Sequence, residues 1–137
     1  MAAISITAAN VLMSSQGISD KSHNAGTTIV QGKSVYLDVN NLWQLANTLT
    51  SAVTAAATGI AISSAALNQP IAVCTKDPSF TLGGTMTAGV AVVVGSASGD
   101  IDNITDVTTG WFTTVLGVPT STTVLNLNPI AGGISHA

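Results

Sequence analysis

Charged residues are scarce in this 137-residue chain, where they make up 7% of the total and include neither Arg nor Glu. Three Lys stand against six Asp, which gives a formal net charge of −3. Proteins that bind nucleic acid or anionic lipid directly need clustered basic side chains to neutralise phosphates. Three scattered lysines cannot form such a cluster, so the sequence predicts no nucleic-acid partner and no membrane partner.

Cysteine is almost absent as well. Cys74 stands alone, which excludes an intrachain disulfide and a cysteine-rich zinc module. The chain begins without the basic and long apolar segments of a secretory signal. Its most apolar stretch, residues 52–62, is too short to cross a bilayer, which takes about 20 apolar residues. We expect a soluble single-domain protein made in a reducing cytoplasm.

Catalytic motifs are also missing. Gly32-Lys33-Ser34 lacks the earlier glycine of a phosphate-binding loop, because Thr27 stands at that position. The two histidines, His23 and His136, lie in a polar segment and next to the end of the chain. A rigid Ser-His-Asp arrangement is not expected at either place. The sequence therefore predicts no enzyme and no cofactor.

The stretch 100–106 holds the one cluster of carboxylates. Asp100 and Asp102 alternate as the first ligands of a calcium loop do, but Ile104 interrupts the pattern. Trp111 then stands where an EF-hand needs its glutamate. We interpret the stretch as a solvated acidic loop and predict no metal site. Whether the loop binds an ion is left open by the sequence.

Short alternating segments separated by turn residues predict an all-β fold. Residues 35–45 are typical of a β-hairpin, and the β-branched run 90–94 is typical of a strand buried on both faces. About seven to nine such strands favour a small single-domain β-sandwich or barrel. A short helical segment is expected near residues 47–57. We assign residues 27–137 to this β domain and residues 1–26 to an extended N-terminal arm or loop.

The low charge has a consequence for the surface. A soluble monomer ordinarily carries about 25–35% charged residues on its surface, and this chain uses Ser, Thr and Ala instead. Such a surface is weakly hydrated and suits burial against copies of itself or against a partner. The alternative is that hydroxyl and amide groups alone keep the protein in solution.

Several motifs follow one another in a fixed order through residues 27–134. They are Gln31-Gly32-Lys33-Ser34-Val35-Tyr36-Leu37-Asp38, Trp43-Gln44-Leu45-Ala46, Gly59-Ile60-Ala61-Ile62, Asn68-Gln69-Pro70-Ile71-Ala72-Val73, Gly110-Trp111, Thr114-Val115-Leu116-Gly117-Val118 and Leu125-Asn126-Leu127. Together they resemble the small decoration, or capsid cement, proteins of tailed bacteriophages. Gly99-Asp100-Ile101-Asp102 departs from the less acidic turn expected there.

The resemblance implies a structural role on the outer surface of the capsid, in a virion protein synthesised in the bacterial host cytoplasm. The partners would be the major capsid protein and copies of the chain itself, as a homotrimer rather than a dimer. The oligomer would bridge capsid subunits and stabilise the head against internal DNA pressure. The alternative is a carbohydrate-binding or adhesive head-fibre module, in which Trp43 or Trp111 stacks on a sugar.

Two sets of apolar residues are candidate interfaces for such a protein. The N-terminal segment carries five that have no obvious place in the core, so we expect removal of residues 1–13 to leave the fold intact. Aromatic side chains are enriched in interface cores. For both tryptophans, packing in the core or in a subunit interface is favoured over sugar stacking. The candidate interface residues are Ile4, Ile6, Val11, Leu12, Met13, Trp43 and Trp111.

Overall fold

The computed structural model describes residues 3–135 and is mostly β, as the sequence predicts. Its elements are η1 (Ala8–Asn10), β1 (Ile18–Asp20), β2 (Asn24–Ala25), β3 (Ser34–Leu37), β4 (Leu42–Leu45), α1 (Ala52–Ala55), β5 (Gly59–Ala61), β6 (Val73–Thr81), β7 (Val92–Val94), β8 (Ile101–Asn103), η2 (Ile104–Asp106), β9 (Phe112–Pro119) and β10 (Val124–Ser135). η1 and η2 are 3-10 turns.

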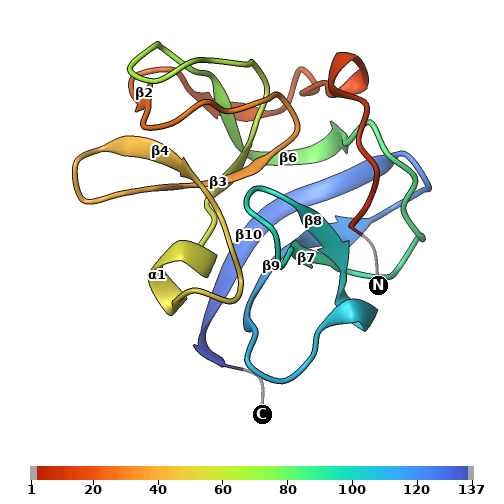
Figure 1. The fold of residues 1–137 in the computed structure, drawn as a ribbon. Coiled ribbons are helices and arrows are strands. Elements are labelled where there is room, and N and C mark those ends of the chain that lie inside the picture. Colours follow the sequence, from red (N-terminus) through yellow and green to blue (C-terminus); the bar gives the residue numbers. More distant parts are fainter. Residues whose placement is uncertain (1–2, 136–137) are drawn as a thin grey trace.

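The strands form one mixed, open sheet (Figure 1). Their order is β2-β4-β3-β5-β6-β10-β9-β7-β8, with β1 paired to β6 outside this path. Only the β2–β4 pair is parallel among the pairs of named strands. The two ends of the path do not pair, so the sheet does not close into the barrel that was one of the two expected architectures.

The predicted hairpin is confirmed as β3 and β4, joined by the turn Asp38–Asn41. The Asp38 carboxylate closes this turn by accepting hydrogen bonds from the amides of Asn40 (2.8 Å) and Leu42 (3.0 Å). Asn41 adopts a positive φ of 60°, which asparagine tolerates better than most residues. The buried run 90–94 is confirmed for residues 92–94, which form β7 and are all buried. Val90 and Ala91 precede the strand and are half-buried.

The short helical segment expected near residues 47–57 is confirmed as α1, a single turn over Ala52–Ala55. Ser51 and Thr54 form a reciprocal capping box that starts α1. The helix ends at Ala55, and Ala56 already leaves helical geometry with ψ of 57°. Thr on either side of this single turn lowers helix propensity, so the cap sets where the helix starts but nothing extends it.

β6 is shared by two parts of the sheet, as Figure 1 shows. Its first residues pair with β5 on one side and β1 on the other, whereas its second half pairs with β10. Asp77 lies at the change of partner and is fully buried. Its carboxylate accepts hydrogen bonds from the amide and hydroxyl of Ser14 and from the amide of Ser79. Pro78, which lacks an amide hydrogen, follows at the irregularity in the β6–β10 ladder.

We expected residues 1–26 to form an extended arm or a loop. The described part, residues 3–26, is a mostly irregular segment that packs on the sheet and does not extend away from the protein, so the arm is wrong and the loop remains. Val11 is 4% exposed and belongs to the main core cluster, and Ile4, Ile6 and Met13 pack against that cluster. Apolar contact with the core is the physical reason that these residues do not project outward. Removal of residues 1–13 would therefore expose core side chains rather than leave the fold intact.

Two glycines let this segment approach the sheet closely. The amide of Thr7 donates to the Gly83 carbonyl at 2.9 Å. A Cβ on Gly83 would lie 2.8 Å from the Thr7 carbonyl oxygen, and one on Gly84 would lie 2.6 Å from that of Ser5. Side chains at these two positions would push the N-terminal segment away from the core.

Replacement of the junction carboxylate tests how far the fold depends on it. Asp77→Ala should lower the free energy of unfolding by about 3 kcal/mol, because the amides of Ser14 and Ser79 and the Ser14 hydroxyl lose the buried carboxylate that accepts from them. Urea unfolding measures this. Lys76→Ala, at the neighbouring exposed position, is the matched control and should change stability by less than about 0.5 kcal/mol. Equal effects of the two substitutions would show that Asp77 has no special structural role.

Candidate functional site

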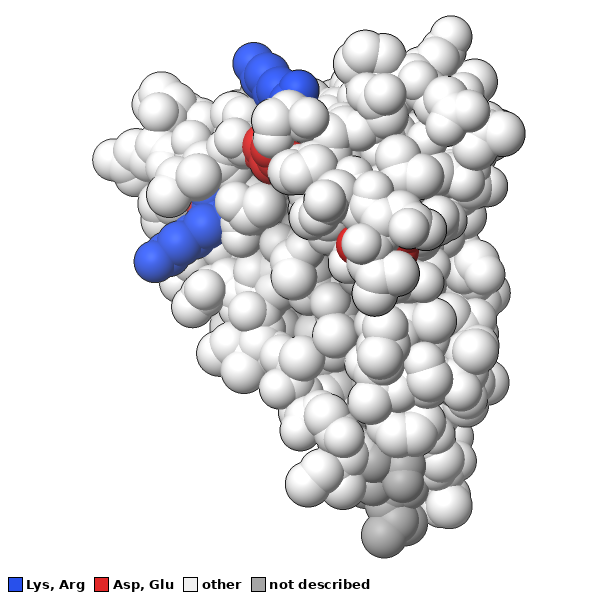
Figure 2. Space-filling model, turned by 90° about the vertical axis from the view of Figure 1, so that its left-hand side faces the viewer, with Lys and Arg blue, Asp and Glu red and all other residues white. Residues whose placement is uncertain are grey.

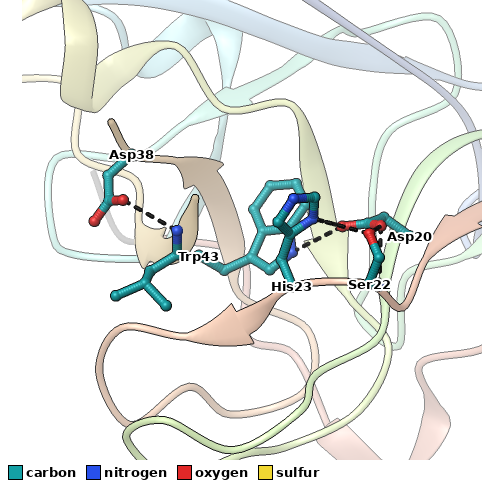
Figure 3. A network of polar contacts seen from close by, with 6 residues as sticks. Asp20, Ser22, His23, Asp38 and Trp43 are labelled. Carbon is teal, nitrogen blue, oxygen red and sulfur yellow. Dashed lines mark hydrogen bonds and ion pairs between the residues drawn. The ribbon is translucent and has the colours of Figure 1, made fainter. Parts of the chain in front are cut away.

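A polar network links the turn after β1 to Trp43 on β4 (Figure 3). The Asp20 carboxylate is at its centre: one oxygen contacts His23 Nδ1 at 2.7 Å and accepts from Trp43 Nε1 at 3.2 Å. The other oxygen accepts from the Ser22 hydroxyl at 2.6 Å. The His23 ring meets the Trp43 ring edge-on, with 6.4 Å between the ring centroids.

These residues include a serine, a histidine and an aspartate, but not in the geometry of a nucleophilic triad. In a triad the imidazole bridges serine and carboxylate through its two different nitrogens. Here Ser22 Oγ (3.1 Å) and the Asp20 carboxylate both approach the same nitrogen, Nδ1 of His23. The histidine therefore has no route for moving a proton from Ser22 toward Asp20. The network instead holds the β1–β2 turn over the buried indole.

Three carboxyl groups have pKa values below the ordinary range. Burial raises the pKa of Asp20, but hydrogen bonds from Ser22 and His23 outweigh it and lower the value to about 2. The hydrogen bond from Gln44 lowers the pKa of Asp38. Burial also raises the pKa of Asp77, but the hydrogen bonds from Ser14 and Ser79 outweigh this effect and lower the pKa below its ordinary value. All three carboxylates are thus stabilised in their charged form by donors within the fold.

Both tryptophans lie inside the protein. Trp43 is 3% and Trp111 6% exposed, and Trp43 belongs to a second core cluster with Val35 and Val73. Neither ring offers a face on which a sugar could stack or a subunit could pack. Of the seven candidate interface residues, Leu12 alone is highly exposed, at 65%. The structure does not bring the N-terminal candidates and the tryptophans together in one exposed surface.

The stretch 100–106 is not the solvated loop that we expected. Asp102 on β8 and Asp106 on η2 are buried, and Asp100 forms an ion pair with Lys33 at 3.0 Å. The Asp102 carboxyl shares a sheet face with its cross-strand partner Val93, which is fully buried, and this position carries the polar group into the interior. The alternation of residue types in the sequence does not show which face of β8 is covered by the rest of the protein.

An open groove of about 650 Å³ lies between residues 9–12 of the N-terminal segment and residues 81, 83–85 and 123. Its lining consists of Ala, Asn, Val, Leu, Thr and Gly. No Asp, Glu, His, Cys, Lys or Tyr lines the groove, so its lining offers no side chain to act as a general acid or base.

Charge is confined to a few parts of the molecule. The ranges 39–75, 78–99 and 107–135 contain no Asp, Glu, Lys or Arg. In Figure 2 the visible charged atoms lie in the upper half, and the tapering lower half shows none. That lower part holds α1, the last residues of β10 and η2 (Figure 1), whose Asp106 is buried. We call it the uncharged end and define it by its large exposed apolar side chains: Leu49, Val53, Ile130 and Ile134.

The uncharged end was not predicted from the sequence, although the spacing of the charged residues along the chain contains the signal for it. Val53 is 66% and Ile130 63% exposed. β10 extends past the last residue paired with β6, Leu127, and from there pairs only with β9 among the described strands. Exposed strand edges of this kind pair readily with other chains.

Comparison with protein-family profiles, with curated proteins and with solved structures finds no match to this chain. Among residues 3–135, no helix is long and apolar enough to cross a membrane. In the same part of the chain no three His, Cys, Asp or Glu side chains converge as a ready-made metal site.

The lowered pKa values predict how stability changes with pH. Each of these carboxyls has a folded-state pKa below its unfolded value of about 3.9, so its contribution to stability is complete above about pH 5. That contribution is lost as the pH falls toward the folded-state pKa, about 2 for Asp20. Asp20→Asn should therefore lose less stability than the unaltered protein between about pH 5 and pH 2, measured by thermal unfolding. Parallel pH profiles of the two proteins would contradict the assignment.

Proposed function

We propose that the chain is a structural protein of a tailed-bacteriophage virion, a cement or decoration protein on the outer surface of the head. It is made in the bacterial host cytoplasm and bridges major capsid subunits as an oligomer, a trimer in preference to a dimer. The observation that supports this most is the uncharged end, where apolar side chains are exposed and the face drawn in Figure 2 shows no charged atom.

An uncharged apolar surface suits permanent contact with protein for an energetic reason. Burial of a fully exposed Val, Leu or Ile side chain contributes roughly 1.5–3 kcal/mol. No ionised group has to be removed from water at the same time, which for charges that stay unpaired costs several kcal/mol each. Contacts of this strength, repeated over the subunits of an oligomer, add up to firm retention on a capsid lattice.

The contact surface we propose differs from the one that the sequence suggested. Trp43, Trp111 and Val11 are buried in the protomer, so they support the fold beneath the surface. Leu12 remains an exposed candidate on the N-terminal segment. The uncharged end takes the place of the tryptophans as the main region of contact.

The finer architecture we propose is a sandwich-like packing of the two parts of the open sheet, with β6 as the shared strand. The main core cluster supports it, because Ile60 of β5 and Cys74 of β6 pack in one cluster with Leu116 of β9 and Leu125 of β10. A sheet that folds across itself at a shared, irregular strand would place these four residues in one interior.

The experiment is re-addition of purified protein to heads that lack it, taken from the phage that carries this chain. Binding, followed by co-sedimentation, should saturate at a fixed ratio to the major capsid protein. Val53→Lys and Ile130→Lys should each weaken binding about ten-fold or more, or about 1.4 kcal/mol, because the interface would bury an unpaired ammonium group.

Val39→Lys is the matched control, since Val39 is 94% exposed at the tip of the β3–β4 hairpin, next to Asp38. It should bind as the unaltered protein does. Heads that bind no protein would refute the proposed function. Equal binding by all three variants would refute the uncharged end as the contact surface while leaving the cement role intact.

A further inference from the structure

The second half of β10 has an unpaired edge. β6 pairs with β10 only as far as Leu127, and beyond that residue β10 pairs only with β9 among the described strands. Within residues 3–135, no backbone hydrogen bond from any other segment reaches residues 128–135. In an antiparallel pair, the backbone groups of successive residues point alternately toward the partner strand and away from it. Those that point away from β9 here have no partner in the described part of the fold.

The two ends of the sheet, in contrast, are covered. At β8, the amide of Ile4 donates to the carbonyl of Ile101 at 2.8 Å. At β2, the amide of Ala25 donates to the carbonyl of Gln69, also at 2.8 Å. Irregular segments thus pair with both terminal strands of the path. The unpaired edge lies within the path instead, where β10 runs on past β6 toward the uncharged end (Figure 1).

This edge belongs to a supported strand. Every residue from 130 to 134 is exposed, so neither face of the strand is covered there. The neighbouring strand β9 is held on its far side, because the Phe112 amide donates to the Thr48 carbonyl at 2.8 Å. The Thr48 hydroxyl donates in turn to the Phe112 carbonyl at 3.0 Å. β10 therefore lies on a fixed neighbour while its own outer edge stays open.

The edge lacks the most effective protection against pairing. Proteins protect free edges with charged side chains, with proline or with bulges. No charged residue occurs in the range 107–135. Pro129, which has no N–H to donate, precedes the exposed residues, and Gly133 interrupts the extended backbone with a φ of 74°. The residues between them, 130–132, form an edge that is shortened but not blocked.

We propose that an extended, uncharged segment of the major capsid protein adds to this edge of β10 as a further strand. The inference rests on the proposed function and names the part of the partner that the uncharged end binds. Unpaired N–H and C=O groups at a strand edge are matched by another extended backbone, and side chains of the added strand supply the specificity. That segment carries no charge toward β10, because an ionised group buried there would find no counter-charge.

Hydrogen–deuterium exchange of the backbone amides tests strand addition in the unaltered protein. The chain is labelled both free and bound to heads, and exchange is resolved to single residues by mass spectrometry. Amides at alternate positions in residues 130–134 should exchange rapidly in the free protein. On heads they should exchange about ten-fold more slowly or less, because each then donates to the added strand. Amides at the tip of the β3–β4 hairpin, residues 39–41, are the reference and should keep their rates.

A charge placed on the edge gives a second test. Ile134→Lys should weaken binding to heads about ten-fold or more. Leu67→Lys is the matched control, at an exposed apolar position next to Asn68, whose amide donates to β2. It should bind as the unaltered protein does. Raising NaCl from about 0.05 M to about 0.5 M should change the binding of the unaltered protein less than about two-fold, because no ion pair forms.

The outcomes separate this inference from the proposed function. If heads bind no protein, the proposed function itself fails. Saturable binding with unchanged exchange in residues 130–134, or with full binding by Ile134→Lys, would overturn strand addition while leaving the cement role intact. Binding that weakens steeply with salt would overturn the choice of an uncharged segment.

Discussion

The carboxylate of Asp77 is the interaction on which the rest of the fold depends. β6 is the strand common to both parts of the sheet, and Asp77 lies where its pairing changes from β5 and β1 to β10. A buried charge at such a point is tolerated only when it is fully hydrogen-bonded. Ser14 supplies two of the donors, so the same contact that stabilises the charge also ties the N-terminal segment to the sheet.

The placement of charge explains the character of the surface. Of the six aspartates, Asp77, Asp102 and Asp106 are buried. The exterior is therefore even poorer in charge than the composition suggests, and its uncharged end combines this with exposed Val and Ile side chains. Exposed apolar side chains add no stability to a monomer, whereas a protein that buries them against other subunits gains binding free energy from them. This is the physical link between composition, fold and the proposed role on a capsid.

Local features were predictable from the sequence because they depend on near neighbours. The hairpin follows from alternation around Asp38–Asn41, and the burial of β7 follows from its run of valines. Features that depend on contacts between residues far apart in the sequence were not predictable. The N-terminal segment was interpreted as an arm or loop because its own residues do not show that the backbone can approach Gly83 and Gly84 closely enough to pack on the core. The burial of Asp102 depends on which face of β8 is covered, and the exposure of Val53 depends on where α1 lies.

Accessibility of the uncharged end on assembled heads tests the central claim most directly. A single cysteine placed by Val53→Cys can be followed by thiol labelling, with Val39→Cys as the exposed reference and the buried Cys74 as the unreactive background. Both introduced thiols should react rapidly in the free protein. On heads, the thiol at position 53 should become protected while that at position 39 stays reactive. Equal reactivity of the two positions on heads would contradict the account.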